Sequence, residues 1–241
     1  MNAVPGRSLP SSLSLTSNAW APISRAEVVT VALLAAMVLW LVAIALSGDH
    51  AMVDWLTSED GPLEWTSVFA WLLLAVVVLA TGGLNRYTLL LAAVSLLFCA
   101  RELDLHKQAV FGGVSFLKIN FYRGHEVTTL QKLLGGLIAL GVLGTVLAGL
   151  GYNTLVFLRR RLYRQPWGRL VVLAGGLLVL SKVFDRLPAV MADEYHRPLG
   201  WTATAPSHLH EEGLETFVPL LLIATAWLRT RTDDRGAGAP A

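Results

Sequence analysis

The sequence His208-Leu209-His210-Glu211-Glu212-Gly213-Leu214-Glu215 places two histidines and three glutamates directly ahead of an apolar segment. On a helix with 100° per residue, one imidazole and three carboxylates of this stretch fall within an arc of about 100°: His208, Glu211, Glu212 and Glu215. Only thirteen uncharged residues separate Glu215 from Arg229, whereas a membrane-spanning helix needs roughly 20 residues. A spanning helix here must therefore bury carboxylates below the membrane surface. Such groups are costly at that depth and indicate function.

The composition indicates an integral membrane protein. The chain has 241 residues, of which 54% are hydrophobic and 15% are charged, and its mean hydropathy is +0.57. This leaves too little polar surface for a soluble domain and enough apolar residues for several membrane spans. The single cysteine, Cys99, excludes a disulfide framework and a cysteine-based metal site.

Six apolar runs predict an all-α, polytopic bundle of six transmembrane helices. They cover residues 28 to 47, 63 to 83, 87 to 105, 129 to 158, 168 to 190 and 211 to 229. We expect a flexible cytoplasmic tail over 1–26, a transmembrane domain over 27–230 and a second cytoplasmic tail over 231–241. The Ser- and Pro-rich composition of the first segment supports the first tail.

The arginines predict that both termini lie in the cytoplasm. With this orientation the cytoplasmic segments contain the Arg159-Arg160-Arg161 cluster and most other arginines, which is a positive-inside pattern. All six histidines then lie on the outer side. We therefore expect a multi-pass protein of the bacterial cytoplasmic (inner) membrane whose partners are membrane lipids and not nucleic acid.

The second and third helices are expected to add polar groups at the same depth. Glu64 and Ser67 share one face at the start of the second helix. In the third helix, Glu102 and His106 are i, i+4 neighbours that would face the site. Glu59 and Asp60, in the loop before the second helix, allow two interpretations, because helix capping explains them at least as well as function does. In the third helix, Arg101 and Asp104 are expected to form a structural ion pair on another face.

Lys182, Asp185 and Arg186 share a face of the fifth helix and allow two readings. They form a mutually neutralising cluster, or they direct an anionic head group or a developing oxyanion toward the carboxylates.

Two longer loops are expected on the outer side of the membrane. The segment 107–128 is aromatic and basic, which suits a position in the head-group layer. The segment 191–207 is a lid or a plain connector.

The clustered acids predict a bound divalent metal. Five or more carboxylates cannot all stay ionised in a low-dielectric pocket without cations. Two histidines with carboxylates suit a divalent transition metal, with Zn²⁺ the first candidate. The predicted metal ligands are His106, His208, Glu212 and Glu215, and the predicted catalytic groups are Glu64, Ser67 and Glu102. The spacing matches no known zinc signature, because Leu214 stands where an H-E-x-x-H motif would need a histidine.

Three motifs carry a resemblance to known membrane proteins. They are Glu59-Asp60-Gly61-Pro62-Leu63-Glu64-Trp65, Arg101-Glu102-Leu103-Asp104-Leu105-His106-Lys107 and Glu211-Glu212-Gly213-Leu214-Glu215. The chain resembles a functionally uncharacterised group of bacterial polytopic membrane proteins over most of helices two to six. It is more remotely similar to the alkaline-ceramidase-like membrane hydrolases. That likeness implies a histidine-bound zinc beside a helix-two serine, here Ser67. The chain departs from that family in having six expected spans instead of seven and no histidines at i, i+4 in its last helix.

Three classes of function fit these patterns. The first is a metal-dependent hydrolase that opens to the outer leaflet and acts on a lipid or lipid-linked amide or ester. The second is a proton- or cation-coupled transporter that uses the same carboxylates as a relay. The third is a structural or sensory membrane protein in which the charges only hold helices together. The transporter hypothesis is weakened because no polar path to the cytoplasm is visible in the inner halves of helices one, two and four.

Overall fold

The computed structural model of the chain is helical throughout the residues that it describes, which are 20–58, 60–105, 114–125, 127–197 and 199–237. No strand occurs in these ranges. The predicted all-α class is therefore confirmed. His106 falls outside the described residues, as does most of the predicted N-terminal tail.

Each of the six apolar runs contains a long helix. They are α1 (Arg25–Ser47), α3 (Pro62–Gly82), α4 (Arg86–Glu102), α6 (Thr129–Val146), α8 (Pro166–Asp193) and α9 (Trp201–Ala237). The fourth run continues from α6 through a π-helical segment, η3 (Leu147–Gly151), into α7 (Tyr152–Arg159). Three short helices connect these elements: α2 (His50–Thr57), α5 (Ile119–Arg123) and the 3₁₀ turn η4 (Leu162–Arg164).

Local start signals explain where the long helices begin. Ser24 and Thr128 each form a reciprocal capping box with the residue three positions later, at the starts of α1 and α6. Asn85 caps α4 by accepting hydrogen bonds from the backbone N–H groups of its first turn. Pro62 and Pro166 occupy the first position of α3 and α8, where proline's missing N–H costs nothing.

Three helical segments are long and apolar enough to cross a membrane: Arg25–Ser47, His50–Gly82 and Thr129–Arg159. Their apolar side chains point largely outward. In α1, Leu33 and Leu39 are 60% and 68% exposed. Contiguous apolar surface of this extent is unfavourable in water and suits contact with lipid.

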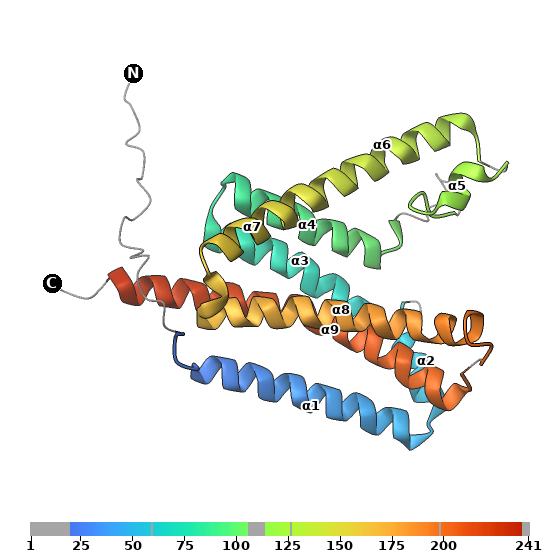
Figure 1. Ribbon diagram of the computed structural model, residues 1–241, viewed down its shortest axis with the longest axis horizontal. Helices are drawn as coiled ribbons and strands as arrows, with labels where there is room; N and C mark the ends of the chain where they lie inside the picture. The colour runs from blue at the N-terminus through green and yellow to red at the C-terminus, as the bar shows by residue number, and fades with distance from the viewer. Residues whose placement is uncertain (1–19, 59, 106–113, 126, 198, 238–241) are drawn as a thin grey trace.

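The core lies where α9 packs between α8 and α3, as Figure 1 shows. Leu214, Val218 and Leu221 recur on one face of α9 at the helical period and are buried. They meet Trp71 of α3 and Leu177 of α8 in one cluster. This packing fixes the rotation of α9 and therefore decides which of its polar residues face the neighbouring helices.

The chain runs back and forth between two ends of the bundle (Figure 1). The starts of α1, α4 and α8 lie at one end, together with α7 and the end of α9. The start of α9 lies at the other end, together with α2 and α5. The arginine-rich segment 159–169 is therefore separated from the His208–Glu215 stretch by the length of the bundle.

Two predicted boundaries were wrong. The third helix was expected to reach residue 105, but α4 ends at Glu102 and Asp104 has a left-handed backbone with φ 49°. The last helix was expected to begin at residue 211, but α9 begins at Trp201 and continues through Pro206. Most of the second half of the predicted loop 191–207 is thus helix, because α9 stays packed against α8 beyond the apolar run.

The described part of the segment 107–128 forms a small core of its own. Phe116, Phe121 and Val127 are buried together. Leu117 and Ile119 are 51% and 63% exposed. The aromatic residues predicted to lie in the head-group layer are therefore partly used for packing, and neighbouring aliphatic residues provide the exposed apolar surface.

Candidate functional site

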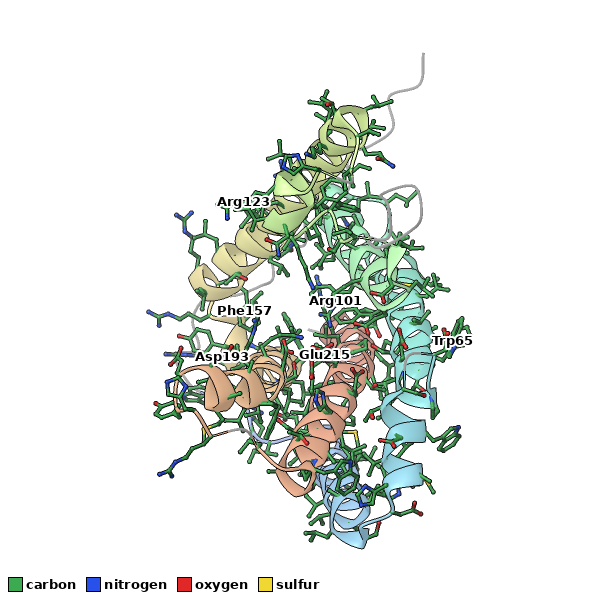
Figure 2. The ribbon with its side chains drawn as sticks, turned by 90° about the vertical axis from the view of Figure 1, so that its right-hand side faces the viewer. Trp65, Arg101, Arg123, Phe157, Asp193 and Glu215 are labelled. Atoms are coloured by element: carbon green, nitrogen blue, oxygen red, sulfur yellow. The ribbon has the colours of Figure 1, made fainter. Side chains whose placement is uncertain are left out.

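A buried glutamate, Glu215 of α9, is the centre of the polar site. Its side chain is 6% exposed, and each carboxylate oxygen receives a cationic donor. Arg101 Nη2 lies 2.5 Å from Oε2 and Lys182 Nζ lies 2.5 Å from Oε1. Ser181 Oγ donates a further hydrogen bond of 3.3 Å to Oε1. Figure 2, which looks at the molecule from one end, shows Arg101 and Glu215 next to each other near the middle of the view, between the helices.

Three helices bring these groups together. Arg101 lies in the last turn of α4, whereas Ser181 and Lys182 lie past the middle of α8. Glu215 lies one turn after Glu211 on the face of α9 that meets α8. α8 and α9 lie side by side, and Glu211 and Glu215 are four residues apart on one face of α9. Lys182 of α8 therefore contacts both carboxylates.

Other carboxylates surround this centre. Glu102 is 6% exposed in its side chain and its Oε1 lies 3.7 Å from Arg101 Nη2. Glu211 Oε1 lies 3.6 Å from Lys182 Nζ. Glu212 is half-buried, and its charge interacts with those of four other glutamates. We call the following set the glutamate cluster: Glu64, Glu102, Glu211, Glu212 and Glu215 with Arg101 and Lys182.

The glutamate cluster has an acidic imbalance. Within the described residues it combines the five glutamates with the two cationic side chains named above. Burial and mutual repulsion both disfavour five ionised carboxylates at such short range. The cluster therefore needs bound protons on some of its carboxylates, or a further cation. The sequence predicted this imbalance from the spacing of the acids alone.

The α3 residues of the predicted site lie at the edge of this cluster. Glu64 Oε2 accepts a 2.7 Å hydrogen bond from the backbone N–H of Asp60, so it stabilises the loop ahead of α3. Ser67, one turn further along α3, is 1% exposed. Its Oγ has no hydrogen-bond partner among the described residues. Ser67 is thus a buried hydroxyl available for a polar partner.

The histidines are distributed differently from the prediction. The His208 side chain is 57% exposed, with Nδ1 3.9 Å from Glu211 Oε2. His210, which lies outside the arc of His208, Glu211, Glu212 and Glu215, is half-buried, with Nδ1 2.6 Å from the carbonyl oxygen of Pro206. Among the described residues no group of three or more His, Cys, Asp or Glu side chains is arranged to hold a metal ion. The predicted ligand His106 lies outside that part of the chain.

Arg101 has partners that the sequence did not predict. Its expected i, i+3 pairing with Asp104 assumed helix through residue 104, but α4 ends at Glu102. Arg101 reaches Glu215 of α9 and its neighbour Glu102. Lys182 is neutralised by acids, as one of the two readings predicted: its Nζ lies 3.7 Å from Asp185 and also binds the carboxylates of α9. The reading in which it directs an anionic head group or an oxyanion stays a prediction.

Sequence reasoning missed the contact of Ser181 with Glu215. The only signal was a serine directly before Lys182, at the end of the uncharged run 170–181. The partner of that serine lies on another helix, so helical periodicity within α8 could not identify it.

The site is closed on one side and open on the other. The apolar core of α3, α8 and α9, which includes Trp71, Leu177 and Val218, continues from the glutamate cluster toward the arginine-rich end. At the opposite end Arg101 and Lys182 are 37% and 42% exposed in their side chains. Glu215 thus contacts the two cationic groups from the buried side, while part of each cationic side chain is exposed.

Comparisons of the chain with protein-family models, with curated proteins and with solved structures gave no significant match. The resemblances that the motifs suggest therefore stay predictions, and the functional argument depends on the geometry of the glutamate cluster.

Proposed function

We propose that the chain is a multi-pass protein of the bacterial cytoplasmic membrane, with six spans and both termini in the cytoplasm. Two observations support this. The long helices alternate in direction between two ends, and the arginine cluster 159–161 lies at the same end as the start of α1 and the end of α9. The positive-inside rule makes this the cytoplasmic end. The glutamate cluster then lies in the outer half of the membrane.

We further propose that the glutamate cluster is the active site of a hydrolase that acts on a lipid or lipid-linked amide or ester in the outer leaflet. The observation that carries this proposal is the anchoring of Arg101 and Lys182 by the buried Glu215. Two cationic groups held in place at an open surface suit an anionic head group or the oxyanion that forms when water attacks a carbonyl. The substrate class follows from the membrane position of the site.

The remaining acids supply the proton transfers of such a reaction. Glu102, buried beside Arg101, accepts a proton from the attacking water. Glu212, whose charge is opposed by four other carboxylates, is held ready to donate a proton to the leaving amine or alcohol. Glu64 and Ser67 are the positioning groups on α3 in this scheme.

The predicted divalent metal stays a separate proposal. The described residues do not present a three-ligand set, and both oxygens of Glu215 already contact cationic donors. The acids left for a cation are Glu102 and Glu212, with His208 at the exposed edge. No step of the proton-transfer scheme depends on the metal.

A second candidate is a proton- or cation-coupled carrier, and the acidic imbalance of the glutamate cluster favours it. The apolar core around Trp71 and Val218 weighs against it, because it separates the cluster from the arginine-rich end. A carrier requires a path that opens through this core.

The test is a hydrolysis assay with purified protein and lipid-linked esters and amides, with products identified by mass spectrometry. Glu102→Gln is expected to lower the rate by about 100-fold or more, since a positioned general base contributes roughly that factor. The matched control is Asp54→Asn, an exposed carboxylate on α2 that should leave the rate unchanged.

A parallel measurement separates the metal from the hydrolase. Elemental analysis of the purified protein, followed by the assay after chelation, reports whether a bound metal supports the rate. If hydrolysis continues after chelation and no metal is detected, the reaction proceeds by acid–base catalysis without a metal. If no lipid ester or amide is cleaved while vesicle assays detect cation or proton movement, the carrier replaces the hydrolase.

A further inference from the structure

A second polar site lies at the arginine-rich end of the bundle, far from the glutamate cluster. A cavity of about 440 Å³ opens between the start of α4 and the π-helical junction of α6 and α7. Its size is within the range of small-molecule sites. Apolar and small residues form most of its wall: Leu90, Ala148, Gly151 and Leu155. Ala148, Gly151 and Leu155 are exposed, so the wall opens toward the surrounding lipid.

An arginine and two tyrosines form the polar mouth of this cavity. Arg86 Nη2 donates a 2.7 Å hydrogen bond to Tyr87 Oη, which lies 3.0 Å from Tyr152 Oη. The two tyrosine rings stack with centroids 5.1 Å apart. The guanidinium of Arg86 lies 4.8 Å from the centroid of Tyr87 and 5.9 Å from that of Tyr152. These contacts hold a cation and two hydroxyl groups at one rim.

The backbone geometry of the wall supports a binding role. The segment Leu147–Gly151 is π-helical, and single π-turns inside long helices are frequent at functional sites. Gly149 packs so tightly against α4 that an added Cβ would lie 2.7 Å from Val94 Cγ2. Gly151 instead faces open space, with nothing within 4 Å of an added Cβ. The π-helical segment thus has a close contact with α4 at Gly149 and an open groove at Gly151.

The charge around the mouth is positive. The charges of Arg86 and Arg160 both act on the two tyrosine hydroxyls. Arg159 is the last residue of α7, Arg160 and Arg161 follow it directly, and this segment lies at the same end of the molecule (Figure 1). Basic pockets between helices at the cytoplasmic membrane surface suit the head groups of anionic lipids.

We propose that this cavity binds one anionic phospholipid of the cytoplasmic leaflet. The phosphate accepts hydrogen bonds from Arg86 and Tyr152 at the mouth, and an acyl chain lies along Leu90, Gly151 and Leu155. A phosphodiester is a strong acceptor for charge-assisted hydrogen bonds. The inference uses the membrane placement proposed above but does not depend on the glutamate cluster.

The experiment is native mass spectrometry of the full chain in detergent, titrated with phosphatidylglycerol, phosphatidylcholine or inorganic phosphate. We expect phosphatidylglycerol to bind about tenfold tighter than phosphatidylcholine, and inorganic phosphate not to displace it. Arg86→Gln removes the charged donor and should weaken phosphatidylglycerol binding about tenfold. Arg123→Gln, at an exposed arginine at the other end of the bundle, is the matched charge control and should have no effect.

A second pair of variants tests the groove without changing any charge. An added Cβ at Gly151 meets nothing within 4 Å. Gly151→Leu should therefore still fold, and its side chain would extend into the path of the acyl chain, so phosphatidylglycerol binding should fall. Gly144→Leu also enters open space but lies outside the cavity lining, and it should bind like the wild type. Glu102→Gln should bind like the wild type as well, which separates this site from the glutamate cluster.

Three results would overturn the proposal. The first is equal binding of phosphatidylglycerol and phosphatidylcholine. The second is unchanged phosphatidylglycerol binding in both Arg86→Gln and Gly151→Leu. The third is displacement of phosphatidylglycerol by inorganic phosphate, which would make the mouth a simple anion site.

Discussion

At the scale of the residue, Glu215 and Glu212 differ in role although they are one helical turn apart. Glu215 is buried and each of its oxygens contacts a cation. Glu212 is half-buried, and its charge is opposed by Glu64, Glu102, Glu211 and Glu215. Glu215 therefore compensates the positive charges of its neighbours, whereas an ionised Glu212 would add to the repulsion among the glutamates.

Neutralising these two residues should change stability in opposite directions. Glu215→Gln leaves Arg101 and Lys182 without their shared counter-ion and should lower the free energy of unfolding by about 2 kcal/mol. Loss of a buried partner costs 3–5 kcal/mol, and the partial exposure of both cations reduces that figure. Glu212→Gln removes a carboxylate whose ionised form is repelled by its neighbours, so it should raise the thermal midpoint at alkaline pH, where Glu212 would otherwise lose its proton. Thermal unfolding in detergent measures both.

Asp185→Asn is the control for this comparison. Asp185 also lies within 3.7 Å of Lys182 Nζ, but its side chain is 38% exposed. We expect a change below about 0.5 kcal/mol, as for other exposed ion pairs. A Glu215→Gln protein as stable as the wild type would show that the cationic groups do not depend on Glu215 for their position.

At the scale of the element, the start of α8 depends on close packing against the turn η4. An added Cβ at Gly168 would meet the backbone carbonyl of Leu162 rather than a side chain that could move. The next residue, Arg169, binds the carboxylate of Glu27 through Nε and Nη2, at 2.6 Å and 2.9 Å. The glycine therefore sets the position of an ion pair that joins α8 to α1.

Gly168→Ala should destabilise the protein strongly for this reason. We expect a loss of about 3 kcal/mol, at the upper end of overpacking costs, because backbone must move. Gly176→Ala in the same helix enters open space and should gain up to about 1 kcal/mol from helix propensity. Chemical or thermal unfolding of the two variants side by side makes the comparison. Equal stability of the two variants would contradict the close approach of η4 to α8.

At the scale of the whole molecule, the direction in which each helix runs determines where both sites lie. The glutamate cluster and the Arg86 cavity are at opposite ends of the bundle. If the arginine-rich end is cytoplasmic, the first site meets the outer leaflet and the second meets the inner leaflet.

Reporter fusions test this orientation. Fusions after Gly83, Arg161 and the C-terminus should report the cytoplasm, and fusions after Gly48, Gly124 and Gly200 should report the outer side. All five named residues lie in turns or connections between long helices. A C-terminal reporter on the outer side would invert the assignment and place the glutamate cluster at the cytoplasmic face.

The sequence by itself determined the positions of the long helices and the face of α9 that carries its acids. Hydrophobic periodicity, capping residues and proline positions are local signals, so each helix can be located from its own residues. Glu211 and Glu215 do face one partner, Lys182, as their spacing of four predicts. The acidic imbalance could also be predicted, because it needs only the identity and depth of the residues.

Only the tertiary structure decided which cation meets which acid. The sequence matched Arg101 to Asp104 because they are close in the chain, and it could not predict the contact with Glu215, which is 114 residues away. That choice depends on how α4, α8 and α9 are rotated about their axes. In a bundle whose outer surface is also apolar, periodicity gives little information on rotation, and close packing at Trp71, Leu177 and Val218 sets it instead.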